Sequence, residues 1–470
     1  MGERCDVLIL GAGSAGFGAA LRAVEQGRYR VILADRNPGF GGTSVFAGVN
    51  CWEPGVTAGS THRRLAAYLE SRGEGFVGEG VLNVSPTQRC YLSDRAQDPY
   101  DSTLRRFGAK SFRRFHFDRK AMSSAMETFV RERDRKGLLE ERFCTELEDL
   151  TVRDGQIVSV SLRGPEGRSV WEPRIVIDAT GDIAAARMAG CEVMLGEDPR
   201  SRFGEQFAPE KAERILNGIS QCFVIRKGGA PYETREDFSD TKATAWMDVV
   251  RRTAEPVAWC VRDPGGDISV NMLPTIEGEA LLSCSGEELR HECRGRVLAY
   301  FCWLRENSVL SGYEISEICP MIGIRESWRL RGRYVLTHTD ILRGCPEATG
   351  QEDVIAVADH PTDTHGRTNV SGMRCAPTGK YGIPYECLLP REIGNLLVAC
   401  RGSSFSHIAA SSARLSRTMI GLGEAAGCAA VLALDAGIGP GELSPTRVCG
   451  ALFADEDAAD RENRRIEIRT

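Results

Sequence analysis

A glycine pattern near the start of the chain constrains its fold more than any other feature. Gly11, Gly13 and Gly16 form a GxGxxG pattern directly after the apolar run 6–10 and at the opening of an expected helix, 15–26. Gly11 allows a tight turn, Gly13 lets the backbone approach a pyrophosphate, and Gly16 lets helix and strand pack closely. The amino end of the helix adds amide donors and a positive dipole end. The pattern therefore predicts a β-α-β unit that binds a dinucleotide.

An acidic residue supports the same interpretation. Residues 30–34 form a second expected strand, and Asp35 lies at its end, about twenty residues beyond the glycines, where a carboxylate accepts hydrogen bonds from ribose hydroxyls. A glycine-rich turn without a ligand is the alternative. Because strand, helix and acid are all in register, the dinucleotide site is favoured.

Composition narrows the class of protein. The chain has 470 residues, so two or three domains of the usual ~150 residues are expected. A formal charge of −6 and a hydrophobic content of 42% disfavour a nucleic-acid binder, a disordered chain and a polybasic membrane adaptor. The 17 cysteines include no CxxC pair, so we expect no metal or iron–sulfur site. No signal-peptide pattern opens the chain and no apolar run approaches ~18 residues, so we expect a cytoplasmic protein with mostly buried thiols.

Two further segments resemble motifs of flavoproteins. Asp35-Arg36, a short spacer and the glycine-containing segment 41–44 are similar to what flavoproteins of the glutathione-reductase-like fold have after their first β-α-β unit. Residues 177–182 resemble the second, ATG-type motif of these proteins, where the chain returns to the nucleotide domain.

The carboxy-terminal part carries the most extensive resemblance. Residues 383–385, 395–399 and 401–427 are similar to the pattern of the bacterial FAD-dependent oxidoreductase family, and 323–336 and 363–365 match its middle motifs. The resemblance runs nearly end to end and implies FAD as cofactor. The cofactor-binding residues expected from these motifs are Gly11, Gly13, Ser14, Ala15, Gly16, Asp35, Arg36, Gly41, Gly42, Thr43, Ser44, Ala179, Thr180, Gly181, Asp182, Arg401 and Arg414.

A physical argument also favours FAD over a nicotinamide cofactor. A long expected helix, 411–434, can direct its first amides at the flavin N1/O2 edge, where negative charge accumulates on reduction. Arg414 in its first turn would oppose the helix dipole, which suggests an anionic partner. The alternative is a packing helix whose Ala and Gly residues permit close approach.

The order of expected elements predicts an α/β fold. It combines a Rossmann-like FAD-binding domain with a parallel sheet and an interrupting mixed α+β substrate domain. We assign 1–60, 116–200 and 376–440 to the FAD-binding domain, 61–115 to an insertion of loops, 201–375 to the substrate-covering domain and 441–470 to a tail. A strong helical pattern covers 286–307.

Three side chains are candidates for catalysis: His407, His365 and Arg325. His407 lies in an expected loop before the last long helix, where it can accept a proton as hydride leaves a carbon; a structural histidine is the alternative. His365 has Asp363 two residues before it, and the alternative is a turn that fixes its own backbone. Arg325 and Arg329 would share one helix face and clamp a carboxylate or phosphate, with a solvated ion-pair face as the alternative.

The leading interpretation is an FAD-dependent oxidoreductase that exchanges a hydride between flavin N5 and a small polar substrate, by dehydrogenation of an alcohol, a sugar-like molecule or an amine. The alternatives are a flavin-dependent reductase of an activated carbon–carbon double bond and an FAD-binding electron-transfer subunit. The missing iron–sulfur spacing argues against the last. We expect a small-molecule substrate, an electron acceptor that the sequence does not identify, and no nucleic-acid or membrane partner; a homo-oligomer is left open.

Overall fold

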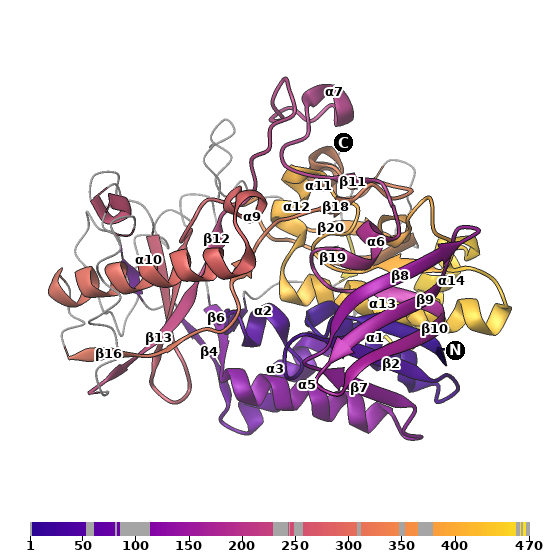
Figure 1. Cartoon of the computed structure of the whole chain (residues 1–470), viewed down its shortest axis with the longest axis horizontal. Coiled ribbons are helices and arrows are strands. Elements are labelled where there is room, and N and C mark those ends of the chain that lie inside the picture. The colour runs from indigo at the N-terminus through magenta and orange to yellow at the C-terminus, as the bar shows by residue number, and fades with distance from the viewer. Residues whose placement is uncertain are drawn as a thin grey trace.

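Two parts make up the computed structural model, a larger one around a central sheet and a smaller one under the helix α10 (Figure 1). The residues that the structure describes are 2–52, 61–79, 82–84, 113–228, 243, 245–248, 257–307, 312–346, 353–364, 379–456, 461 and 464–466.

A seven-stranded sheet forms the centre of the larger part. Its order is β7-β2-β1-β10-β9-β8, and β21 pairs with the carboxyl half of β10. The strands β7, β2, β1, β10 and β21 are parallel, whereas β9 and β8 form an antiparallel hairpin beside the amino half of β10. The bounds are β1 Glu3–Leu10, β2 Val31–Asp35, β7 Leu139–Phe143, β8 Glu146–Arg153, β9 Gln156–Gly164, β10 Gly167–Asp178 and β21 Leu396–Val398.

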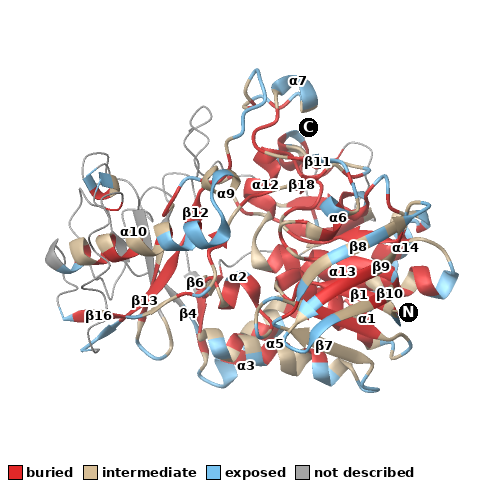
Figure 2. Ribbon diagram, viewed as in Figure 1, coloured by how far each residue is buried: buried red, intermediate tan, exposed pale blue. Residues whose placement is uncertain are grey.

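Alternate residues of β1 face two different cores, because successive side chains of a strand point to opposite faces of a sheet. Val7 and Ile9 are buried with the helices α1 (Ser14–Glu25) and α13 (Ser416–Ala436). Leu8 and Leu10 are buried on the other face with the β8–β9 hairpin and α6 (Ala184–Met188). Figure 2 shows that most of the strands and helices of the larger part are buried. The fold is therefore α/β with a Rossmann-like domain, as the sequence predicts.

Glycines bring α1 and α13 unusually close together. A Cβ atom added at Gly423 would lie 1.8 Å from the carbonyl oxygen of Ala15, and one at Gly18 would lie 2.3 Å from that of Ile420. By length and composition α13 is apolar enough to cross a membrane, contrary to the expectation that no apolar run is long enough. However, 78% of its apolar window is buried inside the protein. The close packing of a long helix through its Ala and Gly residues, which the sequence left as an alternative, is therefore present between α13 and α1.

The smaller part is a five-stranded antiparallel sheet covered by one long helix. Its order is β16-β13-β15-β14-β5, and Phe223 and Val270 pack against Val297 and Phe301 of α10. The helix α10 covers Gly286–Asn307, which confirms the expected helical range. The strands of this five-stranded sheet are β5 Leu82–Val84, β13 Cys222–Lys227, β14 Val257–Arg262, β15 Ile268–Leu273 and β16 Tyr313–Ile318.

The expectation of loops over 61–115 is wrong where the structure describes that segment. The helix α3 (Thr61–Ser71) buries Leu65 and Leu69 in the main core, β4 (Gly75–Glu79) pairs with β6 (Arg113–Phe117), and β5 extends the second sheet. The apolar stripe of α3 is narrow, and its outer face is charged, so the composition of this segment did not indicate a helix. The predicted domain limits stay predictions.

The carboxy-terminal helix is divided, contrary to the prediction. The helix α12 (His407–Ala413) begins at an N-cap hydrogen bond from the Ala409 amide to Ser406, and α13 begins anew after the extended residue Leu415. No glycine or proline marks the break. Gly437 ends α13 in the left-handed conformation, where glycine has no Cβ penalty.

The remaining helices and strands lie around these two sheets. They are α2 Gly42–Val45, β3 Cys51–Trp52, α5 Arg119–Arg133, β11 Val193–Met194, α7 Arg200–Phe203, β12 Ile219–Ser220, α9 Ala280–Ser283, β17 Gly323–Ile324, β18 Arg329–Leu330, α11 His338–Arg343, β19 Val354–Ala358, β20 Tyr381–Pro384, η3 Tyr385–Leu388, η4 Pro440–Glu442 and α14 Pro445–Leu452. Most of the cysteines whose burial the structure describes are buried.

Candidate functional site

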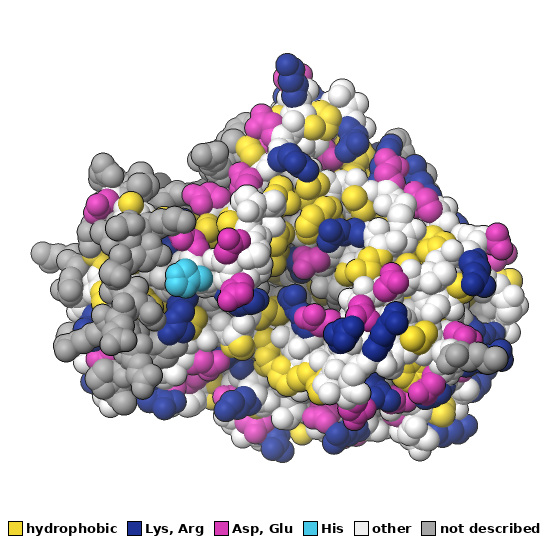
Figure 3. Space-filling model, in the orientation of Figure 1, with side chains coloured by type: hydrophobic (Ala, Val, Ile, Leu, Met, Phe, Trp, Pro, Cys, Tyr) yellow, Lys and Arg dark blue, Asp and Glu magenta, His cyan; other side chains and the backbone are white. Residues whose placement is uncertain are grey.

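A cavity of about 440 Å³ lies at the carboxyl ends of the parallel strands, between the two parts of the molecule. On the face shown in Figure 3 the surface is hollowed between the two parts. The lining includes, among the expected cofactor-binding residues, Gly11, Gly13, Ser14, Ala15, Asp35, Arg36, Gly42, Thr43, Ala179, Thr180, Gly181, Asp182, Arg401 and Arg414. Gly16, Gly41 and Ser44 lie behind it, outside the lining.

The three glycines of the first motif do different work. Gly11 has a φ of 103°, and an added Cβ would lie 2.4 Å from the carbonyl oxygen of Ala179, so only glycine fits between the strands. An added Cβ at Gly16 would lie 1.7 Å from the carbonyl oxygen of Gly11. At Gly13 the nearest heavy atom would be the Cα of Gly42, at 3.9 Å. Gly11 and Gly16 therefore allow the turn and the packing, and Gly13 leaves space open above the start of α1.

Asp35 closes the nucleotide end of the cavity. Its carboxylate accepts hydrogen bonds from the Ala12 amide at 2.5 Å, from the Asn37 amide at 2.6 Å and from the Asn37 side chain at 2.9 Å. These bonds hold the carboxylate at the end of β2, beside the glycine turn. The residue thus occupies the place from which ribose hydroxyls are recognised in this fold.

The segment 41–44 connects the first motif to the last helix. The Gly41 amide donates to the carbonyl oxygen of Ala12 at 2.9 Å, and Gly41 has a φ of 121°. Ser44 is buried and its hydroxyl lies 2.9 Å from the hydroxyl of Ser416 and accepts from the Trp52 indole at 3.0 Å. Ser44 therefore supports the cavity wall from behind.

Arg401 and Asp182 form an ion pair on the opposite wall. The Arg401 guanidinium also lies 3.5 Å from the Ser327 hydroxyl, and its Nε is buried without a hydrogen-bond partner among the described residues. Gly181 has a φ of 81°, and an added Cβ would lie 2.2 Å from Nη1 of Arg401. A side chain at position 181 would displace the arginine, so glycine and arginine are matched.

The amino end of α13 faces the cavity. Leu415 is its N-cap residue and provides no side-chain hydrogen bond, and the first turn contains no acidic residue. Leu415, Ser416 and Met419 line the cavity. The free amides of the first turn and the positive end of the helix dipole therefore point at whatever occupies this space. This end lies five residues later in the chain than the sequence predicts.

Arg325 lines the same cavity, but no helix carries it. It follows β17, and Arg329 begins β18, so the expected shared helix face does not exist. Nη1 of Arg325 donates to the carbonyl oxygen of Gly218 and to the hydroxyl of Ser220, both at 2.8 Å. Burial, and then the positive charge of Arg414, lower the pKa of Arg325 to about 10, so it stays protonated at neutral pH.

Arg414 ends α12 instead of opening the long helix. Its guanidinium contacts Asp363, with Nη2 3.3 Å from the carboxylate, and its Nε is buried without a hydrogen-bond partner among the described residues. The opposition to the helix dipole that the sequence suggested is therefore absent, because α13 begins after Arg414.

His407 is held in a buried charged network away from the cavity lining. Its Nδ1 lies 2.9 Å from Glu326, its Nε2 lies 3.8 Å from Glu197, and its amide donates to Asp198 at 3.0 Å. Burial lowers the pKa of His407, but the charge and hydrogen bond of Glu326 outweigh burial and the pKa is raised. Arg329 is only 1% exposed and pairs with Asp198 at 3.0 Å, so the solvated ion-pair face is wrong.

His365 lies outside the described residues, so its role stays a prediction. The structure also brings residues to the cavity that sequence reasoning missed. They come from β8, β12, β15, β17, α13 and several loops, and most of them are brought together only by tertiary packing: Asn37, Val49, Thr145, Glu146, Leu147, Ser220, Asn271, Met321, Ile322, Gly323, Ile324, Cys400, Leu415, Ser416 and Met419.

Comparison with known proteins decides the family. The sequence model described as "FAD dependent oxidoreductase" matches residues 6–452. The chain belongs to the FAD-dependent oxidoreductase family. It is an enzyme of that class, and its cofactor is FAD.

Other similarities are more distant. A segment of 71 residues, covering 14% of this chain and 12% of its relative, is 41% identical to a 4-oxocyclohex-2-ene-1-carboxylate 5-dehydrogenase from Sinomonas cyclohexanicum. A geranylgeranyl bacteriochlorophyll reductase-like protein from Thermoplasma acidophilum superposes with a TM-score of 0.48 at 10% identity, over 99% of this chain and 87% of that one. An aklavinone-11 hydroxylase in complex with FAD and aklavinone superposes with a TM-score of 0.43 at 11% identity, over 93% of this chain and 64% of that one. The glutathione-reductase-like assignment stays a prediction.

The cavity of this oxidoreductase fits FAD. The space above Gly13, the uncapped starts of α1 and α13, and the unpartnered Nε of Arg401 supply donors for a pyrophosphate and for a polar ring edge. Burial raises the pKa of the Cys400 thiol in the same wall to about 12, so this thiol stays neutral at pH 7.

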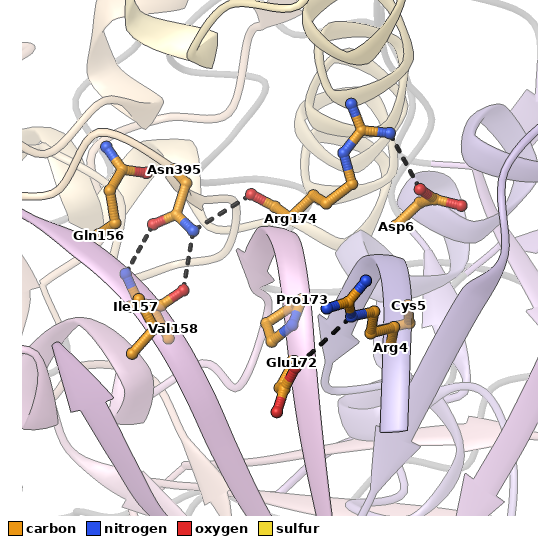
Figure 4. Close-up of a pocket in the computed structure, with 10 residues that line it drawn as sticks. All are labelled: Arg4, Cys5, Asp6, Gln156, Ile157, Val158, Glu172, Pro173, Arg174 and Asn395. Atoms are coloured by element: carbon orange, nitrogen blue, oxygen red, sulfur yellow. Dashed lines mark hydrogen bonds and ion pairs between the residues drawn. The ribbon is translucent and has the colours of Figure 1, made fainter. Parts of the chain in front are cut away.

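A second cavity of the oxidoreductase, about 480 Å³, lies at the amino ends of the strands. Figure 4 shows polar side chains of this cavity bonded to each other and to the backbone. Arg174 pairs with Asp6 at 3.1 Å, Arg4 approaches Glu172 at 3.7 Å, and the Asn395 side chain bonds to the backbone of Ile157 and to the carbonyl oxygen of Arg174 within β10. These interactions join β9, β10 and the start of β21, so this cavity has a structural explanation.

Proposed function

We propose that this oxidoreductase is a dehydrogenase of a small polar organic molecule. One observation carries the proposal: Ser220 of β12, Asn271 of β15 and Arg325 after β17 line the same cavity as the dinucleotide motifs. A substrate held by these residues would therefore lie beside the cofactor. When bound, FAD supplies the acceptor for a hydride, and the substrate loses that hydride together with one proton.

The residues of this chain would divide the work. The glycine turn and the start of α1 would hold the pyrophosphate, Asp35 the ribose, and Arg401 with Asp182 the middle of the cofactor. The amides of α13 would stabilise negative charge at the nearby ring edge. Arg325 would orient the substrate through its guanidinium. His365 remains our candidate for the proton acceptor, and His407 would position the segment that carries Arg325, through Glu326.

The relative's name supports the direction of the reaction, since it denotes a dehydrogenase of a ring carboxylate. A reductase of an activated carbon–carbon double bond is the second candidate, because Arg325 would suit the carboxylate of such a substrate equally well. Both candidates use the same cavity and differ in which substrate donates or accepts the hydride.

Anaerobic mixing tests the proposal. A panel of alcohols, amines and cyclic keto acids, including 4-oxocyclohex-2-ene-1-carboxylate, is added to the oxidised protein while flavin absorbance is recorded. We expect bleaching by at least one member of the panel. Absence of bleaching by all of them, with rapid reoxidation of the dithionite-reduced protein by an unsaturated acid, would reject the dehydrogenase in favour of the reductase.

A further inference from the structure

The side chain of Arg325 leaves one edge of its guanidinium unused. Nη1 makes both hydrogen bonds, to Gly218 and Ser220. Within the described part of the chain, Nε and Nη2 donate to no protein group, and no carboxylate forms an ion pair with Arg325. Nε and Nη2 lie side by side in the planar fork, which matches the two oxygens of a carboxylate.

Other charged groups in the described lining already have partners or are exposed. Asp182 pairs with Arg401, Arg414 contacts Asp363, and the Asp35 carboxylate accepts backbone amides. Arg325 differs because it is half-buried and its partners are uncharged. The charge of Asp363 acts on Arg325, but its carboxylate contacts Arg414 and forms no ion pair with Arg325 among the described residues. A half-buried cation without a direct ion pair is costly, and an anionic ligand would relieve that cost.

A neighbouring amide has the same incomplete bonding. Asn271 of β15 lines the cavity, and its Oδ1 is buried without a hydrogen-bond partner in the described part of the chain. Ser220 connects the two residues, since its hydroxyl accepts from Arg325 and donates to the carbonyl of Met272, the residue after Asn271. Oxygen and nitrogen of an amide can exchange places by rotation, so Asn271 can present either a donor or an acceptor to a ligand.

We propose that Arg325 and Asn271 form the subsite for a carboxylate group of the substrate. The inference rests on the proposed function and makes it more specific, because the substrate class becomes small organic carboxylic acids. Nε and Nη2 of Arg325 would bind the two carboxylate oxygens, and Asn271 would bind a polar atom beside them. A neutral substrate of the same shape would leave the guanidinium without its partner.

Binding to the oxidised FAD-loaded protein tests this subsite without turnover. Benzoate and benzamide are titrated separately, because they share a shape and differ in charge, and perturbation of the flavin absorption spectrum reports binding. We expect benzoate to bind at millimolar concentration and benzamide to bind much more weakly. Arg325→Gln should weaken benzoate binding about 10- to 100-fold, the loss expected for a charge-assisted hydrogen-bond pair, and leave benzamide unchanged.

Three further variants sharpen the test. Arg325→Lys keeps the charge without the fork and should bind benzoate with intermediate affinity. Asn271→Asp adds a negative charge and should weaken benzoate alone, and it keeps the test valid if the Arg325 variants do not fold. Arg226→Gln removes an exposed arginine that pairs with Asp267 on the same sheet, and should change neither titration.

The results separate this subsite from the proposed dehydrogenase activity. A loss of bound FAD in Arg325→Gln, equal weakening of benzoate and benzamide, or no benzoate binding to the wild-type protein would overturn the subsite. Benzoate binding that depends on Arg325, without bleaching by any compound of the panel, would uphold the subsite and count against the dehydrogenase alone.

Discussion

Replacement of His407 tests whether it positions the cavity wall or performs catalysis. Its ring donates into a network in which Glu326 also meets Arg329 at 3.1 Å and the Asn217 side chain at 2.7 Å. A hydrogen bond to a charged group contributes about 1.5–3 kcal/mol. Because Glu326 keeps its other partners, His407→Ala should cost about 2–3 kcal/mol, below the ~3–5 kcal/mol of a fully broken buried ion pair.

The cost should depend on pH in one direction. The pKa of His407 is raised in the folded protein above its ordinary value of 6.5, chiefly by Glu326 against the opposing effect of burial. A raised pKa contributes stability that is fully present below about pH 6.5 and is lost as pH rises through the folded pKa. The destabilisation by His407→Ala should therefore be largest in mildly acidic buffer and shrink in alkaline buffer.

Urea unfolding followed by tryptophan fluorescence, repeated across pH, measures this effect. His407→Asn is the matched control, because it keeps a donor near Nδ1 but has no titratable proton; it should recover part of the stability and show none of the pH-dependent term. A destabilisation that grows with pH would refute the network. Unchanged stability in His407→Ala together with a hundredfold or larger loss of substrate-dependent flavin reduction would instead identify His407 as the general base.

Two further predictions concern the glycine turn Gly11–Gly16 and the start of α13, which would hold the cofactor. Gly13→Ala places a methyl group in open space, so the protein should keep its unfolding midpoint but purify with less FAD. Gly16→Ala places a methyl group 1.7 Å from the carbonyl oxygen of Gly11, so it should lower the unfolding midpoint itself. Equal flavin content in Gly13→Ala and the wild-type protein would contradict these separate roles. Leu415→Asp caps α13 with a negative charge and should lower the flavin reduction potential on the order of 20 mV, measured by spectroelectrochemistry. Leu415→Asn is the uncharged control, and an equal shift in both variants would exclude the charge as the cause.

Local sequence patterns predicted the parts of the site that adjoin in the chain. Gly11, Gly13, Gly16 and Asp35 follow from a strand, a turn and a helix whose spacing is set within about 25 residues. The helix α10 follows from its periodicity in the same way. Each of these features depends on backbone geometry over a few turns or strand residues, which sequence spacing records directly.

Features that depend on packing were predicted poorly. A helical spacing was assigned to Arg325 and Arg329, although the segment leaves one short strand and enters another. The boundary between α12 and α13 carries no helix-breaking residue, and the burial of His407 depends on acids 81 and 209 residues earlier in the chain. Hydrophobic periodicity contains no information on which distant charges will meet.

The sequence by itself therefore determined the α/β class, the dinucleotide cradle and the family, because these rest on short-range geometry and on motifs that stay together in the chain. Only the tertiary structure decided what shares the cavity with that cradle. Pairing of β12 with β17, and the placement of β15 beside them, bring Ser220, Asn271 and Arg325 to one wall. Contacts across such separations form only when the two sheets pack, since burial of apolar surface, and not local propensity, selects them.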